Sequence, residues 1–360
     1  MTGALTSIGL PEVIGVIMIV SLNAYVITGG ADFGGGVWDL LATGPRRAAQ
    51  RTLIAHELGP IWEANHVWLI FVIVILFTAF PPAFATLSTV LHIPLTIMLI
   101  GIVLRGSSFV FRSYGARDDL TQARWGRVFA IASTVTPVAL GVIVGAIVSG
   151  AVGAAASEIA RGSLGTANGA VPAFSSVYVA PWLAPFPLAV GAMALAMFAF
   201  LAAVYLALAA PDNQLREDFR RRGLAAAAAM FVTAFGALAI ARFGVPDVAD
   251  SLVAQEALAF QAATAVAALM AIWALWSRRW ALARIAAATQ VSLILWGWVI
   301  AQYPFVIPTS LTVRAAAAPR ATLVLLLYGV LAGAVLLLPA LAYLYRTFAR
   351  RRDEAMPRQQ

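Results

Sequence analysis

The sequence contains no cysteine and no lysine, and only 11% of its 360 residues are charged side chains. The lack of cysteine excludes disulfides, thiolate nucleophiles, iron–sulfur clusters and cysteine-based metal sites. Three histidines are few for a protein that binds metal or haem through imidazole. What remains is apolar: 62% of the residues are hydrophobic and the mean hydropathy is +0.88. This composition predicts a polytopic membrane protein.

The basic side chains are all arginine, and the net charge is +8. Nucleic-acid binding is one interpretation of this excess. Basic loops on the cytoplasmic side of a membrane protein produce the same excess, and we prefer that interpretation, with no nucleic-acid partner. The first residues, "MTGALTSIGLPEVIG", lack a basic segment and a convincing cleavage site. The first apolar run is therefore predicted to be a retained span rather than a signal peptide.

Nine apolar runs are long enough to cross a bilayer, which takes about 20 residues. They cover 10–28, 60–79, 83–104, 127–149, 183–209, 223–241, 258–276, 283–302 and 321–345. The pattern predicts an all-α polytopic protein with one membrane domain over 1–360. The connection 29–59 includes the amphipathic stretch "VWDLLATGPRRAAQR", which predicts an interfacial helix. The connection 150–182 shows no clear helical pattern.

The arginines are distributed unevenly between the two predicted sides. Twenty of the 24 lie in the connections after the first, third, fifth and seventh spans and in the C-terminal tail. The other four are Arg161, Arg242, Arg314 and Arg320. The positive-inside rule then predicts an outside N-terminus and a cytoplasmic C-terminus, which fits an odd number of spans.

Polar side chains gather at the start of the second span, in "GPIWEANHVWLI", where Glu63, Asn65 and His66 occur together. Asp32 follows the first span, so this orientation places both Asp32 and Glu63 at the cytoplasmic end. Pro60 suits the first turn of a helix and would put Glu63 about one turn inside. His92 is predicted near the middle of the third span, where Pro94 would disturb the backbone hydrogen bonds.

Metal and haem sites are two interpretations of these residues. Glu63 and His66 have the spacing of a di-iron ligand pair, but a second such pair and further helical carboxylates are missing from the spans. No metal site is therefore expected. His92 would suit a haem ligand by position. A buried imidazole that bonds to a neighbouring helix is the interpretation we favour.

A proton path fits the cluster better, because ionisable groups at membrane depth are costly and tend to mark ion or proton routes. The alternative is that Glu63 only caps its helix and meets an arginine of residues 46–51. Physical reasoning alone leaves the two interpretations about equal.

Two further patterns have ordinary structural explanations. The glycine-rich stretch 28–38 follows no strand and precedes no Gly-Lys-Ser/Thr motif, so a close-packed backbone at a helix end is expected instead of a nucleotide loop. Five of the ten tryptophans lie mostly near span ends and fit an aromatic belt. They are Trp62, Trp68, Trp182, Trp296 and Trp298.

Four blocks in this order resemble subunit II of the cytochrome bd-type quinol oxidases. They are "GGADFGGGVWDLL", "GPIWEANHVWLIFVIVILFTAFP", "LRGSSFVFR" and "AQYPFVIPTSLTV". The second block is specific and the fourth supports it, and the resemblance extends from the first span to the last. The motif positions expected to serve packing are Gly30, Gly34, Trp62, Trp68, Arg105, Arg112, Pro304 and Pro308.

The resemblance implies a subunit of a complex in the bacterial inner membrane that oxidises quinol and reduces oxygen to water. It implies two four-helix bundles, about 10–149 and 183–302, plus a peripheral helix at about 321–345. Haem b and haem d would belong to the partner, subunit I, and none would be ligated by this chain. Small single-span accessory subunits and a structural quinone occur in some relatives.

The resemblance also implies roles for the polar cluster. It assigns Asp32, Glu63, Asn65 and His66 to a path that brings cytoplasmic protons toward the haem d region. The sequence departs from the family pattern at Gly29, where the first acid of Asp-Gly-x-Asp is missing. Two rival functions stay open: a proton-coupled secondary transporter, which would show broken spans in both halves, and a self-sufficient haem protein that uses His92.

Overall fold

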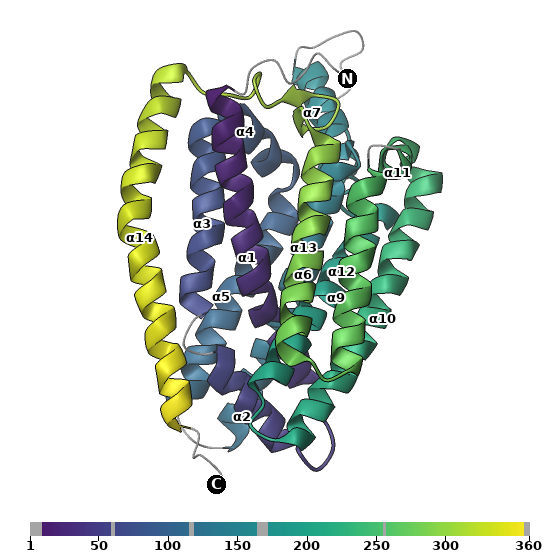
Figure 1. Cartoon of the computed structure of the whole chain (residues 1–360). Helices are drawn as coiled ribbons and strands as arrows, with labels where there is room; N and C mark the ends of the chain where they lie inside the picture. The colour runs from purple at the N-terminus through teal and green to yellow at the C-terminus, as the bar shows by residue number, and fades with distance from the viewer. Residues whose placement is uncertain (1–8, 59–61, 115–118, 164–171, 255–256, 356–360) are drawn as a thin grey trace.

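The computed structural model describes residues 9–58, 62–114, 119–163, 172–254 and 257–355. Long helices run between the two ends of an elongated bundle (Figure 1). They are α1 (Leu10–Leu40), α3 (Trp62–Ala79), α5 (His92–Tyr114), α6 (Asp119–Val148), α9 (Pro185–Ala209), α10 (Asn213–Gly244), α12 (Leu258–Trp276), α13 (Trp280–Gln302) and α14 (Arg320–Ala355). In this part of the chain, eight helices are long and apolar enough to span a membrane, or nine with a bent pair. The predicted all-α membrane fold is confirmed.

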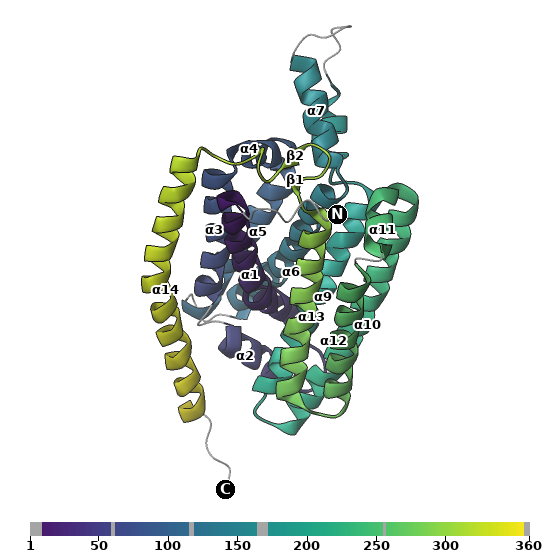
Figure 2. The same cartoon turned by 45° about the horizontal axis from the view of Figure 1, so that its top comes forward.

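Shorter elements close the two ends. They are α2 (Arg47–Leu58), α4 (Pro81–Val90), α7 (Ala151–Ser163), α8 (Phe174–Tyr178), α11 (Pro246–Val253), β1 (Phe305–Ile307) and β2 (Leu311–Thr312). The strands form an antiparallel pair in which Phe305 faces Thr312. The helix α2 lies at the end where the chain finishes, whereas α4, α7, α11 and the strands lie at the opposite end (Figures 1 and 2).

The two ends differ in charge as the sequence predicts. The end with α2 also holds the start of α10 and the turn between α12 and α13, and we call it the Arg-rich end. The opposite, Arg-poor end carries α7, α11 and the strand pair, and with them Arg161, Arg242 and Arg314. Arg320 begins α14 at that same end.

The core of the molecule is centred on α9, which packs against α1, α6, α10 and α13. Its residues Phe198, Phe200 and Leu201 are almost completely buried. Trp38 on α1 donates a hydrogen bond from Nε1 to the carbonyl oxygen of Ala199, at 2.7 Å. Gly34 lies where α1 comes closest, because an added Cβ there would overlap the Phe198 carbonyl. This contact fixes α1, and with it the acids of α1, against the core.

The last helix, α14, lies at the edge of the bundle and packs against α3 and α1 (Figure 1). Only 6% of its apolar span is buried. A helix this exposed and this apolar faces lipid or another membrane subunit. The division of the remaining helices into bundles at 10–149 and 183–302 stays a prediction.

The first span does not end at residue 28, as the sequence predicts, but continues as α1 to Leu40. The glycine-rich stretch is therefore helix interior and not a helix end. Glycine is tolerated in membrane helices because neighbouring helices compensate for its weak helix propensity. Here the glycines allow close packing on α9 and α6. The predicted interfacial helix of residues 29–59 is restricted to α2.

The third span is also displaced. The pair Pro81–Pro82 ends α3, and α4 bends away from α3 by 116°. The span itself begins at His92 and runs to Tyr114. His92 is therefore an exposed residue at the Arg-poor end, bonded to the Thr89 carbonyl at 2.9 Å, and not a buried imidazole at mid-membrane. Pro94 falls in the first turn, where its missing N–H interrupts nothing.

Two consequences of these shifts concern function. Arg105, predicted in a connection, lies within the span of α5. Asp32, predicted near the membrane edge, lies eight residues before the end of α1, or about 12 Å along the helix. The connection 150–182, in which the sequence shows no clear helical pattern, contains α7 and α8.

Candidate functional site

The polar cluster is built around Asp32, whose side chain is only 1% exposed. Asn65 on α3, also 1% exposed, donates a hydrogen bond from Nδ2 to Asp32 Oδ2. Within the described chain Asp32 Oδ1 accepts no hydrogen bond. The bond joins two motifs that are 33 positions apart in the sequence, because α1 and α3 pack side by side.

Arg105 on α5 provides the positive charge nearest to this acid. It is 2% exposed, and its charge acts on Asp32 without a direct ion pair. Its guanidinium lies over the rings of Phe33 and Phe129, at 4.8 and 5.5 Å from their centroids. Its Nε has no hydrogen-bond partner among the described residues. A buried arginine is retained at such a position only when a nearby acid offsets its charge.

A second acid–arginine group lies two helical turns nearer the Arg-rich end. Arg112 donates to both carboxylate oxygens of Asp39, each at 3.3 Å. Arg51 on α2 lies 3.7 Å from the same carboxylate. Burial lowers the pKa of Arg51, and the charge of Asp39 opposes that shift. Sequence reasoning did not identify Asp39 as a functional candidate.

The signal that could have found Asp39 is a repeat of seven residues. Asp32 and Asp39 are seven apart on α1, and Arg105 and Arg112 are seven apart on α5. Positions seven apart lie on one side of a helix, about 10 Å apart along its axis. Both helices run in the same direction (Figure 1), so the two acids and the two arginines meet in matching order. We call these four residues the acid–arginine ladder.

His66 and Tyr25 line the cluster on the side toward the Arg-poor end. The His66 ring meets Tyr25 and Phe33 edge-on, with 5.9 Å between ring centroids in each case. Tyr25 is 1% exposed, and its hydroxyl has no partner within the described residues. Tyr25 is seven positions before Asp32, so it continues the same side of α1. The structure therefore brings together Asp32, Asn65 and His66.

Glu63 is different. It lies in the first turn of α3, as predicted, but its side chain is exposed on the surface of the chain. Among the described residues it makes no ion pair, and Arg46 and Arg51 instead contact Asp218 and Asp39. The contact with an arginine of residues 46–51, which the cap interpretation implies for Glu63, is therefore absent among the described residues. An acid in a first turn is favourable for the helix in any case. Pro60 lies outside the described residues.

The remaining motif positions serve packing in different places. An added Cβ at Gly30 would lie 2.8 Å from the Phe198 ring, and one at Gly29 would lie 2.8 Å from the Tyr25 ring. Trp68 packs beside Leu69 and Phe198, whereas the side chain of Trp62 lies outside the described residues. Pro304 and Pro308 lie at the Arg-poor end, where the Pro304 carbonyl accepts a hydrogen bond from the Val313 amide at 2.9 Å.

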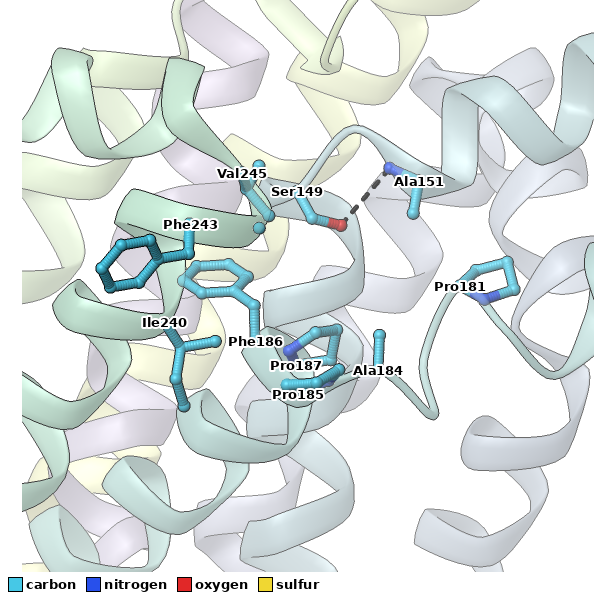
Figure 3. A pocket seen from close by; sticks show the side chains of 11 residues that line it. Ser149, Ala151, Pro181, Ala184, Pro185, Phe186, Pro187, Ile240, Phe243 and Val245 are labelled. Carbon is cyan, nitrogen blue, oxygen red and sulfur yellow. Dashed lines mark hydrogen bonds between the residues drawn. The ribbon is translucent and has the colours of Figure 1, made fainter.

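An apolar cavity of about 530 Å³ lies apart from these acids, near the Arg-poor end (Figure 3). The end of α6, the start of α9 and the end of α10 form it. Its lining includes Phe186, Pro187, Ile240 and Phe243, and one side-chain hydroxyl, that of Ser149. That hydroxyl accepts a hydrogen bond from the Ala151 amide at 3.3 Å. The cavity offers no acid or base for chemistry.

The described residues contain no group of three or more histidine, aspartate or glutamate side chains placed to hold a metal ion. His56, His66 and His92 lie on three different elements, α2, α3 and α5. The absence of a haem ligand in this chain stays a prediction.

Comparison with known proteins gives this arrangement a context. A family model described as cytochrome bd terminal oxidase subunit II matches residues 10–348. The chain belongs to the cytochrome bd terminal oxidase subunit II family. The match includes all four sequence blocks and the whole acid–arginine ladder, so the family resemblance is confirmed.

Individual relatives of this bd oxidase subunit II match it over limited stretches of sequence. Cytochrome bd ubiquinol oxidase subunit 2 of Bacillus subtilis (strain 168) is 36% identical over 95 residues, 26% of this chain and 28% of the relative. Cytochrome bd-I ubiquinol oxidase subunit 2 of Escherichia coli (strain K12) is 27% identical over 135 residues, 36% of this chain and 34% of the relative. The matched stretches thus span about a third or less of those relatives.

The fold of the bd subunit II chain agrees over a much larger part. It matches a chain in the structure of bd oxidase from Geobacillus thermodenitrificans with a TM-score of 0.72 and 22% identity. The match covers 94% of this chain and 98% of that chain. At this identity the likeness shows the shared fold.

Proposed function

We propose that this chain is subunit II of a cytochrome bd-type quinol:oxygen oxidoreductase. It supports a haem-bearing subunit I, which holds haem b and haem d, and it ligates no haem itself. The observation that carries the proposal is the family match over residues 10–348. The proposed complex can also contain small accessory subunits and a structural quinone. The helices divide into two four-helix bundles with α14 peripheral.

The chain's own part in the reaction is to conduct protons. Reduction of oxygen to water consumes both electrons and protons. Quinol supplies the electrons, and the protons must be brought in from the cytoplasmic side. Glu63 receives protons near the Arg-rich end, and the buried group of Asp32, Asn65 and His66 passes them inward. Buried and edge carboxyls joined by polar side chains are the usual components of such a route. The direct bond between Asn65 and Asp32 supports this assignment.

Within this route the two ladder acids have different tasks. Asp39 is held by Arg112 and Arg51, so it fixes α1, α2 and α5 together. Asp32 accepts one hydrogen bond from an amide and has no direct ion pair among the described residues, which leaves Oδ1 for a proton or a water molecule. Gly29 stands where the family pattern has its first acid, so Asp32 and Glu63 are the two acids of the route here.

The rival functions have weaker support. A secondary transporter would have a broken span in each half, and the described chain has one bent pair, α3 with α4. A self-sufficient haem protein would need His92 in the interior, and His92 is exposed at the Arg-poor end.

Replacing Glu63 by glutamine tests the proton route. The amide keeps the shape of the side chain but carries no proton. The complex should assemble with normal haem content, and its quinol-dependent oxygen consumption per haem should fall at least about tenfold. Glu63→Asp should retain more activity. Glu158→Gln, an acid at the Arg-poor end, is the matched control and should leave turnover unchanged.

A cap role for Glu63 predicts the opposite pattern. Loss of a helix cap costs about 1 kcal/mol of stability and leaves turnover per haem intact. Full turnover in Glu63→Gln, with or without a lower melting temperature, would therefore exclude the proton role. The family assignment would stand in that case, because it rests on other residues.

The orientation in the bacterial inner membrane is a second proposal with its own test. We propose that the Arg-rich end is cytoplasmic and that the N-terminus lies outside. The chain has no cysteine to remove, so single cysteines can be introduced directly. Ser163→Cys on α7 should react with an impermeant maleimide only from the outside, and Ala49→Cys on α2 only from the cytoplasm. The reverse labelling would invert the topology.

A further inference from the structure

Several arginines at the Arg-rich end form ion pairs with acids of the same chain. Arg46 contacts Asp218, Arg112 contacts Asp39, and Arg220 contacts Glu217. Five exposed arginines at this end have neither an acid nor another hydrogen-bond partner among the described residues. They are Arg47, Arg124, Arg127, Arg279 and Arg284. Two of these, Arg279 and Arg284, belong to the hairpin of α12 and α13.

Arg284 has the most unusual position of the five. It is the fifth residue of α13, about 6 Å along the axis from the first, and so lies inside a candidate span. Its neighbour Ile285 is 60% exposed, which shows that this side of α13 faces outward. An arginine on an outward face inside a membrane must extend toward the headgroup layer to keep its charge solvated.

Arg279 lies at the same end of the hairpin, in the turn after α12. Its guanidinium lies over the ring of Trp273, 4.8 Å from the centroid. Trp273 and Trp276 are 48% and 71% exposed, as expected for tryptophans at the level of lipid headgroups. Arg278, the residue before Arg279, is instead 3.7 Å from Glu217. The turn therefore presents an arginine that is ordered by an aromatic ring but lacks a counter-ion.

We propose that this end of the α12–α13 hairpin binds the phosphate headgroup of an anionic phospholipid. Arg284 is the main phosphate ligand and Arg279 is the second. Arginine suits this task because its planar fork can donate two hydrogen bonds to one phosphate. The acyl chains lie along the outward apolar residues of the two helices, which include Val266, Leu269 and Met270.

The two positive charges of Arg279 and Arg284 favour a lipid with a net negative headgroup. A zwitterionic lipid carries its own cation, which would repel two arginines. An acidic protein segment would not match the apolar surface that continues along α12 and α13 below the arginines. The proposal is independent of the proton route, because the residues of that route lie on α1 and α3.

Native mass spectrometry of the purified full-length chain with its copurifying subunits tests the proposal. Phosphatidylglycerol and phosphatidylcholine are titrated separately, and bound lipid is counted. Arg284→Gln and Arg279→Gln should each lower the apparent affinity for phosphatidylglycerol about fivefold, and the double variant about 25-fold. Binding of phosphatidylcholine should be unchanged. Inorganic phosphate alone should not displace the bound lipid.

Arg242→Gln is the matched control, because Arg242 is an exposed arginine at the other membrane edge that is already paired with Asp250. It should change phosphatidylglycerol affinity less than twofold. Equal melting temperatures of the variants show that folding is preserved. Unchanged phosphatidylglycerol affinity in the double variant would overturn the proposal. Displacement of the lipid by free phosphate, or equal loss of phosphatidylcholine, would overturn it as well.

Discussion

Gly34→Ala is expected to reduce the stability of the protein by about 3 kcal/mol or more. An added Cβ at Gly34 would overlap the Phe198 carbonyl and would lie 2.8 Å from the Ala202 Cβ. Backbone atoms of α9 cannot rotate away as a side chain can, so α1 and α9 would have to separate. Overpacking of a tight core commonly costs 1–3 kcal/mol, and a clash with backbone is at the upper end. The melting temperature of the purified complex measures the loss.

Gly236→Ala is the matched control. Gly236 is also inside a long helix, α10, but nothing lies within 4 Å of an added Cβ there. Alanine has a higher helix propensity than glycine by up to about 1 kcal/mol, so this variant should be unchanged or slightly stabilised. If the two variants melt at the same temperature, the close approach of α1 to α9 does not limit stability.

Arg105→Met should have the second large effect, a loss of about 3–5 kcal/mol. The substitution keeps much of the side-chain volume between Phe33 and Phe129 but removes the charge that acts on Asp32. The two groups form no direct ion pair, but removal of Arg105 takes away the buried positive charge nearest to Asp32 and leaves that acid uncompensated. Asp32→Asn in the same chain removes that remaining charge. The double variant should therefore be more stable than Arg105→Met alone.

The comparison of all four forms in one denaturation series gives the coupling between the two residues. Arg124→Met, which removes an exposed arginine without a described partner, is the control and should change stability by less than about 0.5 kcal/mol. A double variant no more stable than Arg105→Met would show that Arg105 acts through packing on the aromatic rings and not through Asp32.

These experiments also separate stability from proton conduction. Glu63 is exposed and makes no described ion pair, so its substitution should affect turnover and leave melting unchanged. Arg105 is buried, so its substitution should affect melting first. The two residues belong to one family motif set, but the difference in their burial predicts different physical tasks for them.

The sequence by itself determined the class of fold, because apolar runs of membrane length and the uneven arginines are readable without any tertiary contact. It also determined that Glu63 starts a helix, since that depends on local residues. The limits of the first and third spans were predicted wrongly. Hydropathy does not distinguish a spanning helix from an apolar helix such as α4 that lies across the end. Glycine content does not reveal whether a neighbouring helix supports the backbone.

Only the tertiary structure decided the depth and the partners of the polar groups. The sequence shows that Asp32 and Asn65 are 33 positions apart, but not that α1 and α3 place their side chains in contact. The pairing of Asp39 with Arg112 likewise depends on the common direction of α1 and α5. A buried polar group needs a hydrogen-bond or charge partner, and the packing of the helices determines which groups are near enough. That packing depends on many residues together, so it cannot be inferred from the local sequence.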